Sequence, residues 1–202
     1  MATYVPASFF AKIGMNTSPR PRAPATIALA GARDHAVALR LFFFLALFGL
    51  LQGLYGAAKG GWVEKLVIDR ATVQTAAWLI HLADPAVQVR AVGSRLVAPG
   101  GGINVLNGCE GADVVFLMTA AMLVAPLPLR ARTTGVLAGV AVVFALNQAR
   151  VIALFYASRG DKAAFEWMHG VAGPLVLIAV SAIFYALWLS RHAAGANLTT
   201  ST

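Results

Sequence analysis

The chain has 202 residues, of which 59% are hydrophobic and only 12% are charged, and it carries a formal net charge of +8. A soluble domain averages about 45–50% apolar and about 25% charged residues, so this composition excludes an ordinary soluble domain and indicates an integral membrane protein. The basic residues flank apolar runs, as topology signals do, and we therefore expect no nucleic-acid partner. A single cysteine excludes an internal disulfide.

The N-terminal part of the chain divides into a polar tail and a first apolar run. Residues 1–35 include Pro19-Arg20-Pro21-Arg22-Ala23-Pro24 and predict a disordered tail. Residues 36–58 are long and apolar enough to cross a bilayer. Small residues at the end of this run leave a cleaved signal peptide as an alternative, but its length and the basic tail before it favour an uncleaved span.

The loop after this span covers residues 59–111 and predicts two local structures. Residues 62–82 have apolar side chains at helical spacing, but charges interrupt them, so we expect an amphipathic helix on the outer membrane surface. Residues 87–91 alternate in polarity and predict a strand. Pro99-Gly100-Gly101-Gly102 predicts a turn, and residues 103–106 a returning strand.

Three further apolar stretches, 112–129, 133–157 and 169–190, complete the predicted architecture. The fold class is therefore an all-α integral membrane protein with about four transmembrane helices, an outer interfacial helix and a small β element before the second span. The membrane domain is 36–192, followed by a tail at 193–202. The tight turn at Arg130 and Arg132 favours the cytoplasm, which places both tails inside the cell.

Three chemically distinctive residues fall at one depth in this topology. Distances along the helices can be measured from the basic residues at the inner ends of the spans, at ~1.5 Å per residue. The cysteine loop, Arg150 and His169 each lie about 27–33 Å from those residues. The hydrocarbon core is about 30 Å thick, so all three reach the outer boundary. The spacing predicts equal depth but not contact, because the sequence does not give the rotation of each helix.

Each of the three has an ordinary structural interpretation. A lone cysteine is commonly a small hydrophobe, but Cys109 lies in the polar run Asn107-Gly108-Cys109-Glu110-Gly111 at a predicted helix start, where unpaired N–H groups stabilise a thiolate. Arg150 could reach the outer headgroups. An arginine inside an apolar helix is nevertheless a functional hypothesis by default, and Asn147 shares its face. His169 alone would be an interfacial histidine.

The combination points to acyl transfer rather than to metal chemistry. One Cys and one well-placed His are too few ligands for zinc, so we expect neither a metal nor another cofactor. A cysteine attacks an acyl carbonyl to form a thioester, a histidine exchanges the protons, and an arginine holds the oxyanion. The expected substrate is a membrane-anchored polypeptide whose scissile bond lies just outside a span.

The motifs resemble those of the exosortase/archaeosortase family. The resemblance covers residues 86–189 and rests on Asn107-Gly108-Cys109-Glu110-Gly111, Asn147-Gln148-Ala149-Arg150 and Phe165-Glu166-Trp167-Met168-His169, and it is strongest to the short, exosortase H-type bacterial members. It implies a catalytic set of Cys109, Arg150 and His169. From their positions beside these three residues, we expect Asn147, Glu110 and Asn107 to support the site. Many members have Ser or Asn at the position of Glu110, which leaves the subtype open.

The resemblance also implies a substrate and a location. Members cleave C-terminal sorting signals, which consist of a short motif, a transmembrane helix and a basic tail, and transfer of the new carboxyl end to an acceptor such as a lipid or glycan is proposed for the family. The location would be the bacterial inner membrane, with the site facing the periplasm or exterior. The alternative is a non-enzymatic membrane subunit in export or polysaccharide assembly. A transporter is disfavoured, because its polar residues would lie near the midplane.

Overall fold

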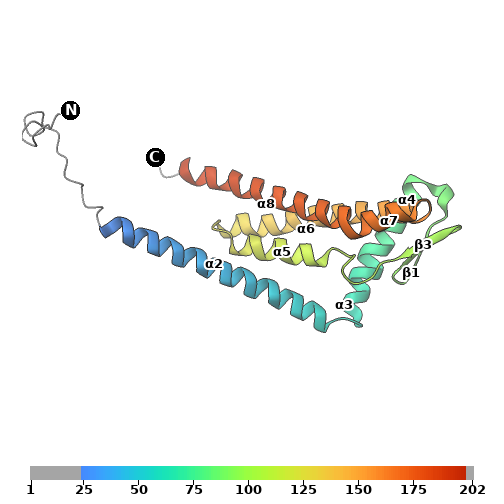
Figure 1. Ribbon diagram of the computed structural model, residues 1–202, viewed down its shortest axis with the longest axis horizontal. Helices are drawn as coiled ribbons and strands as arrows, with labels where there is room; N and C mark the ends of the chain where they lie inside the picture. The colour runs from blue at the N-terminus through green and yellow to red at the C-terminus, as the bar shows by residue number, and fades with distance from the viewer. Residues whose placement is uncertain (1–23, 199–202) are drawn as a thin grey trace, which may run out of the picture. The chain divides into compact units, whose positions relative to one another are not determined.

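The computed structural model describes residues 24–198, which are mostly helical (Figure 1). Three helical segments are long and apolar enough to cross a membrane, namely Asp34–Ala57, Leu129–Ser158 and Lys162–His192. They correspond to the first, third and fourth predicted spans, and they agree with a multi-pass membrane protein. The chain divides into two units, Met1–Leu39 and Arg40–Thr202. The described part of the first unit is the beginning of one helix, and the packing described below belongs to the second.

Helix α2 (Pro24–Ala57) contains the first predicted span. Proline is favoured at the first helical position, because its missing N–H needs no partner there. The helix thus begins before residue 36, where we expected the tail to end, and residues 1–23 of that tail lie outside the described residues. Phe42 and Leu54 are 63% and 61% exposed, which suits a surface that faces lipid. The division into tail and membrane domain stays a prediction.

A continuous helical rod follows, as the helical spacing of residues 62–82 predicted. It consists of α3 (Trp62–Glu64), the π-helix η1 (Lys65–Gln74) and α4 (Thr75–Ala83). One side of the rod is buried at Ile68, Val73 and Ile80. These residues pack in the main core with Leu96 of the sheet and Phe155 of the long helix α6 (Leu129–Ser158). The helix is confirmed, whereas its position on the membrane surface stays a prediction.

The β element is a three-stranded antiparallel meander in the order β1 (Arg90–Val92), β2 (Arg95–Ala98) and β3 (Gly101–Asn104). The predicted turn is confirmed at Pro99 and Gly100, but Gly101 and Gly102 already belong to β3, which begins and ends two residues before the strand predicted at 103–106. The first strand begins later than the alternation at 87–91 predicted, because Pro85–Val87 forms a 3-10 turn. The strand β2 was missed by the sequence analysis. Gly93, with a φ of 57°, allows the tight turn that separates β1 from β2.

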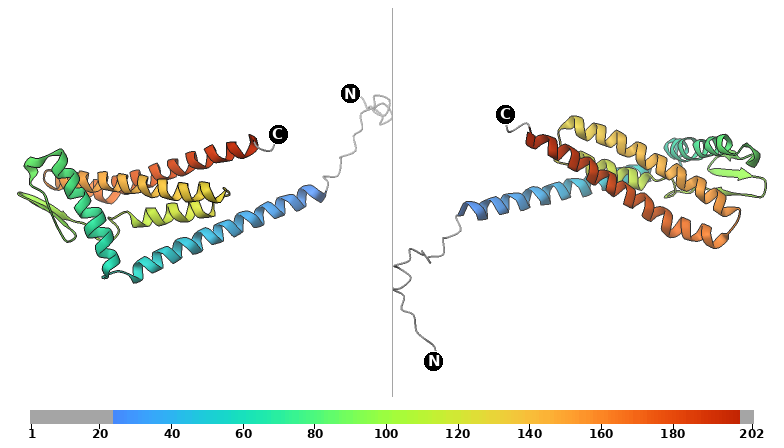
Figure 2. Two further views of the ribbon diagram at one scale, coloured as in Figure 1. Left: turned by 180° about the vertical axis from the view of Figure 1, so that it is seen from behind. Right: turned by 90° about the horizontal axis from the view of Figure 1, so that it is seen from above.

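Three helices form the bundle of the second unit: α5 (Ala112–Val124), α6 (Leu129–Ser158) and α8 (Gly173–Leu198). They run side by side in both views of Figure 2. Small residues allow close packing, since a Cβ at Gly135 would lie 2.7 Å from the Trp188 Nε1 atom and one at Gly139 would lie 2.7 Å from the Met118 Cγ atom. The indole of Trp188 also donates a hydrogen bond of 3.1 Å to the carbonyl of Ala131.

The second predicted span, 112–129, is not formed as one helix. Helix α5 has 13 residues and ends at Val124, and at ~1.5 Å per residue it is ~20 Å long, short of the ~30 Å of a hydrocarbon core. Pro126 and Pro128 follow it, and proline excludes the preceding residue from helical geometry. Arg132 donates hydrogen bonds to the carbonyls of Leu127 and Leu123, at 2.7 and 2.9 Å, and so caps the end of α5. The structure thus has three helices long and apolar enough to cross a membrane and one shorter apolar helix, α5.

The hairpin of β2 and β3 gives a test of the sheet. A Cβ at Gly102 would collide with the carbonyl oxygen of Leu96 and lie 3.2 Å from the Cα atom of Val97, both of which are backbone atoms. We expect Gly102→Ala to destabilise the protein by about 1–3 kcal/mol or more, because the strand cannot move without breaking its pairing. The matched control is Gly160→Ala, whose Cβ meets nothing within 4 Å. Thermal unfolding of the purified protein in detergent measures both; equal midpoints would contradict the β2–β3 register.

Candidate active site

The cysteine lies in a tight loop between strand β3 and helix α5. The Cys109 backbone N–H donates a hydrogen bond of 2.9 Å to the carbonyl of Leu106. Gly108 and Gly111 have φ values of 92° and 79°, which L residues with a side chain rarely adopt. The Cys109 thiol is partly exposed at this turn. Two glycines therefore shape the loop and leave the sulfur accessible just before the first turn of α5.

The histidine lies where a short helix continues into a π-helical turn. Helix α7 (Lys162–Trp167) leads into η3 (Met168–Ala172), and such π turns are frequent at functional sites. The His169 ring stacks on the Phe165 ring one turn earlier, with centroids 5.7 Å apart and planes 1° from parallel. Its Nδ1 atom lies 4.0 Å from the Cys109 Sγ atom. This is longer than an ordinary hydrogen bond, yet it brings the two predicted partners into contact.

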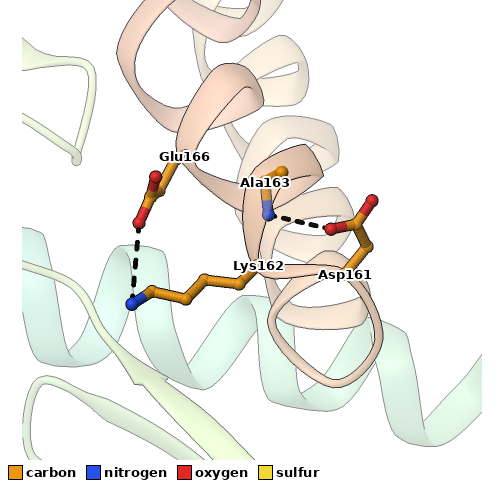
Figure 3. Close-up of polar contacts among 4 residues, drawn as sticks. All are labelled: Asp161, Lys162, Ala163 and Glu166. Atoms are coloured by element: carbon orange, nitrogen blue, oxygen red, sulfur yellow. Dashed lines mark hydrogen bonds and ion pairs between the residues drawn. The ribbon is translucent and has the colours of Figure 1, made fainter.

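The start of α7 is fixed by local polar contacts, which Figure 3 shows. The Asp161 side chain accepts a hydrogen bond of 2.8 Å from the Ala163 N–H and so caps the helix. Lys162 and Glu166 form an i, i+4 ion pair of 3.9 Å on its exposed surface. An exposed pair of this kind contributes little, so the cap is the main reason that this short helix begins at Lys162.

The arginine reaches from α6 to the backbone of the histidine turn. The Arg150 Nη2 atom donates a hydrogen bond of 3.4 Å to the carbonyl oxygen of His169. Its Nε atom is buried and has no partner among residues 24–198. Gly173 makes room for this side chain, since a Cβ there would lie 2.7 Å from Arg150 Nε. Arg150 therefore lies against the histidine turn and the start of α8.

Asn147 supports the cysteine loop from behind. Its side chain is only 1% exposed, and a Cβ at Gly111 would lie 3.0 Å from the Asn147 Cγ atom. Asn147 and Arg150 thus lie one turn apart on α6, the first against the cysteine loop and the second against the histidine turn. The prediction that they form one polar face within the bundle agrees with these contacts.

The two other predicted supporting residues have different surroundings. Glu110 is 8% exposed, and its Oε2 atom has no hydrogen-bond partner within the described part of the chain. The Asn107 side-chain amide donates a hydrogen bond of 3.1 Å to Glu64 Oε1 on α3, so it ties the loop to the helical rod. The structure describes neither residue as a partner of the thiol.

Sequence reasoning missed several neighbours of the site. Gln148 donates a hydrogen bond of 3.1 Å to the carbonyl of Ala71 and joins α6 to η1. Phe165 and Glu64 contact the site through His169 and Asn107, as described above. Tyr55 is buried near Glu110. It lies in an apolar run, where one hydroxyl group does not indicate a functional site. Of these neighbours, only Gln148 could have been predicted from the sequence, because it is a second polar residue beside Asn147 in an apolar helix.

These contacts define the class of protein as a multi-pass membrane protein in which a thiol contacts an imidazole and a guanidinium binds the backbone of the same histidine turn. Within residues 24–198 no group of three or more His, Cys, Asp or Glu side chains is arranged to hold a metal ion. A family model described as Transmembrane exosortase (Exosortase_EpsH) matches residues 23–186. The chain therefore belongs to the transmembrane exosortase family. No curated protein and no solved structure gave a significant match.

The contact between Gly111 and Asn147 can be tested with a matched glycine. Gly111 and Gly60 have φ values of 79° and 77°, but a Cβ meets Asn147 only at Gly111 and meets nothing within 4 Å at Gly60. Alanine at either position costs roughly 1–2 kcal/mol for the left-handed backbone. We expect Gly111→Ala to cost about 1 kcal/mol more, as for overpacking.

A double-mutant cycle then isolates the contact. Combining Gly111→Ala with Asn147→Ala should recover the excess cost, whereas combining Gly60→Ala with Asn147→Ala should give additive losses. Thermal unfolding in detergent supplies the five free-energy differences, for the three single and two double variants. Additive losses at both glycines would show that Asn147 does not support the loop.

Proposed function

We propose that this protein is a membrane-embedded cysteine transpeptidase or protease that cleaves the C-terminal sorting signals of exported proteins through a thioester intermediate. The observation that carries the proposal is the 4.0 Å contact between Cys109 Sγ and His169 Nδ1. The two residues are far apart in the sequence and come from different elements, and the family match agrees with this chemistry. Catalytic hydrogen bonds are often long before substrate binds and shorten in the complex.

In the proposed reaction, which balances, each group has one role. The Cys109 thiol gives its proton to His169 Nδ1, and the thiolate attacks the scissile carbonyl carbon. Arg150, always charged, stabilises the oxyanion of the tetrahedral intermediate. As the C–N bond breaks, His169 returns the proton to the leaving amine, and a thioester remains on Cys109. Water or an amine then attacks the thioester while His169 takes its proton, and the thiol is restored.

The substrate and the membrane arrangement complete the proposal. A membrane-anchored protein would present a short motif beside Cys109, with its apolar helix in the bilayer and its basic tail in the cytoplasm. Loop charges support an active site on the periplasmic or exterior face of the inner membrane. In this arrangement residues 112–129 make a fourth crossing, with Arg132 at its inner boundary, and the rod of residues 62–83 lies at the outer surface. A lipid or glycan amine is a candidate acceptor for the thioester.

Substitution of the nucleophile is the direct test. We expect Cys109→Ala to abolish processing of a co-expressed substrate, namely a protein of the same genome that ends in a shared short motif, an apolar helix and a basic tail. The reason is that no other group can form the thioester. His169→Ala should reduce processing by roughly 100-fold or more, as expected for loss of a general acid–base group.

The matched control for the histidine is His81→Ala, because His81 is exposed on α4 and lies outside the site. Processing is followed by the loss of the substrate tail on immunoblots, with the membrane level of each variant measured in parallel. Normal processing by Cys109→Ala would refute the proposed mechanism.

Two glycines near the histidine test the role of Arg150 without removing its charge. A Cβ at Gly173 would lie 2.7 Å from Arg150 Nε and 2.7 Å from the Met168 carbonyl oxygen, whereas one at Gly170 would meet nothing within 4 Å. We expect Gly173→Ala to displace the guanidinium and lower kcat by roughly 10–100-fold, since small misplacements of a catalytic group are costly. Gly170→Ala should retain the activity of the unsubstituted protein. The rate of substrate processing at equal protein levels compares them, and equal rates would exclude a positional role for Arg150.

The second candidate is a non-enzymatic membrane subunit, and the bond from Arg150 to the His169 carbonyl favours it specifically. In that case Arg150 holds two helices together and the thiol has no chemical role. Arg150→Ala would then lower the thermal midpoint of the protein while Cys109→Ala leaves its cellular function intact. The transpeptidase predicts the opposite result for Cys109→Ala.

A further inference from the structure

An apolar cavity of about 440 Å³ lies beside the cysteine loop. Its walls come from the last turns of α2, from the helical rod, and from α5 and α6, all within the unit Arg40–Thr202. Most of the wall is aliphatic or aromatic, with Leu51, Val115 and Phe144 as examples. Among the residues that form the wall, Glu110 directly follows Cys109 in the chain. The proposed mechanism gives this cavity no role.

The end of the cavity at the loop is polar and negatively charged. Glu110 and Tyr55 are 8% and 9% exposed, and the Tyr55 hydroxyl lies close enough to the Glu110 carboxylate to interact with it, yet neither the hydroxyl nor the Glu110 Oε2 atom makes a hydrogen bond of good geometry among the described residues. Glu64 and Asp113 add their charges to that of Glu110 at the Tyr55 hydroxyl. Within residues 24–198, Lys162 and Glu166 form the ion pair that the structure contains. The carboxylates of Glu64, Glu110 and Asp113 are therefore not paired with a basic side chain in this part of the chain.

A buried carboxylate without a partner is costly, and a bound cation that donates hydrogen bonds would remove this cost. Amides satisfy two of the surrounding acids, because Asn107 donates to Glu64 and Gln52 donates to Asp113 at 2.9 Å. Glu110 keeps the unsatisfied oxygen. The loop end of the cavity is therefore suited to a cationic head group with N–H donors.

The other end of the cavity extends into the apolar part of the bundle. Asn147 lies at the level of the cysteine loop, and Val140, which lines the cavity, is seven residues earlier on α6. At ~1.5 Å per residue the cavity therefore extends ~10 Å along the helix from the polar end. The four-carbon stem of a lysine side chain is too short to fill it, whereas the acyl chain of a lipid continues through it into the surrounding bilayer.

We propose that this cavity is a binding site for an aminophospholipid, with its primary ammonium group at Glu110 and Tyr55 and an acyl chain along α5 and α6 toward Val140. A primary ammonium supplies three N–H donors, whereas a quaternary head group supplies none and an anionic one is repelled by the three acids. The site rests on and deepens the proposed function, which names a lipid amine as a candidate acceptor, but its test is independent, because binding is measured without cleavage.

The test is native mass spectrometry of the detergent-purified full chain. Phosphatidylethanolamine, phosphatidylcholine and phosphatidylglycerol with identical acyl chains are added separately at equal concentrations. We expect phosphatidylethanolamine to bind about ten-fold more tightly than the other two, and Glu110→Gln to remove this preference, since a charge-assisted hydrogen bond is lost. Glu166→Gln is the matched control, because Glu166 lies on the surface of α7; it should keep the preference.

A second variant tests the apolar end independently. Val140→Phe fills the cavity and should lower phosphatidylethanolamine binding, whereas Leu137→Phe on the same helix should not, since Leu137 is 71% exposed and lies outside the cavity wall. Equal binding of all three lipids, or an unchanged preference in both Glu110→Gln and Val140→Phe, would overturn the proposal. If Glu110→Gln does not fold, the comparison of Val140→Phe with Leu137→Phe decides. Substrate processing is a separate assay, so a lack of enzymatic activity would not affect this result.

Discussion

The charge of Arg150 within an apolar helix is the constraint on which the rest of the site depends. Such a group is tolerated in a membrane protein only where it faces the interior and finds a partner. Here the partner is the carbonyl of His169, and the bond joins α6 to the turn before α8. Gly173 provides the space, and Phe165 holds the imidazole plane. The same bond that gives the guanidinium a partner therefore holds the histidine turn beside the cysteine loop.

The sequence allowed prediction of depth but not of contact. Hydropathy and charge identified three spans, because the bilayer thickness imposes a minimum length on each. Helix spacing likewise brought Cys109, Arg150 and His169 to one boundary. Their adjacency depends on how α5, α6 and α8 are rotated, and this follows from packing at small residues such as Gly135 and Gly139, which no local pattern encodes. Before the structure was considered, only the family resemblance predicted that these three residues lie next to one another.

The errors of prediction have local causes. Residues 112–129 were expected to form one continuous helix because they are uniformly apolar, yet Pro126 and Pro128 end the helix at Val124. The strand β2 was missed because Gly93 and Ser94 make a turn too short to interrupt the alternation. The hydroxyl of Tyr55 and the carboxylate of Glu110 were not associated, because they come from segments that only the folded chain brings together.

The short helix α5 also has a consequence for the lipid around it. A ~20 Å helix matches a bilayer that is ~10 Å thinner than the usual ~30 Å hydrocarbon layer, and each ångström of mismatch costs a fraction of a kcal/mol. The capped carbonyls at its inner end and the cysteine loop at its outer end then draw both water interfaces toward each other. Under the proposed function, a substrate helix that diffuses to this position would have a few of its outermost residues lifted out of the hydrocarbon. The peptide bond beside them would then become hydrated and extended only at this site.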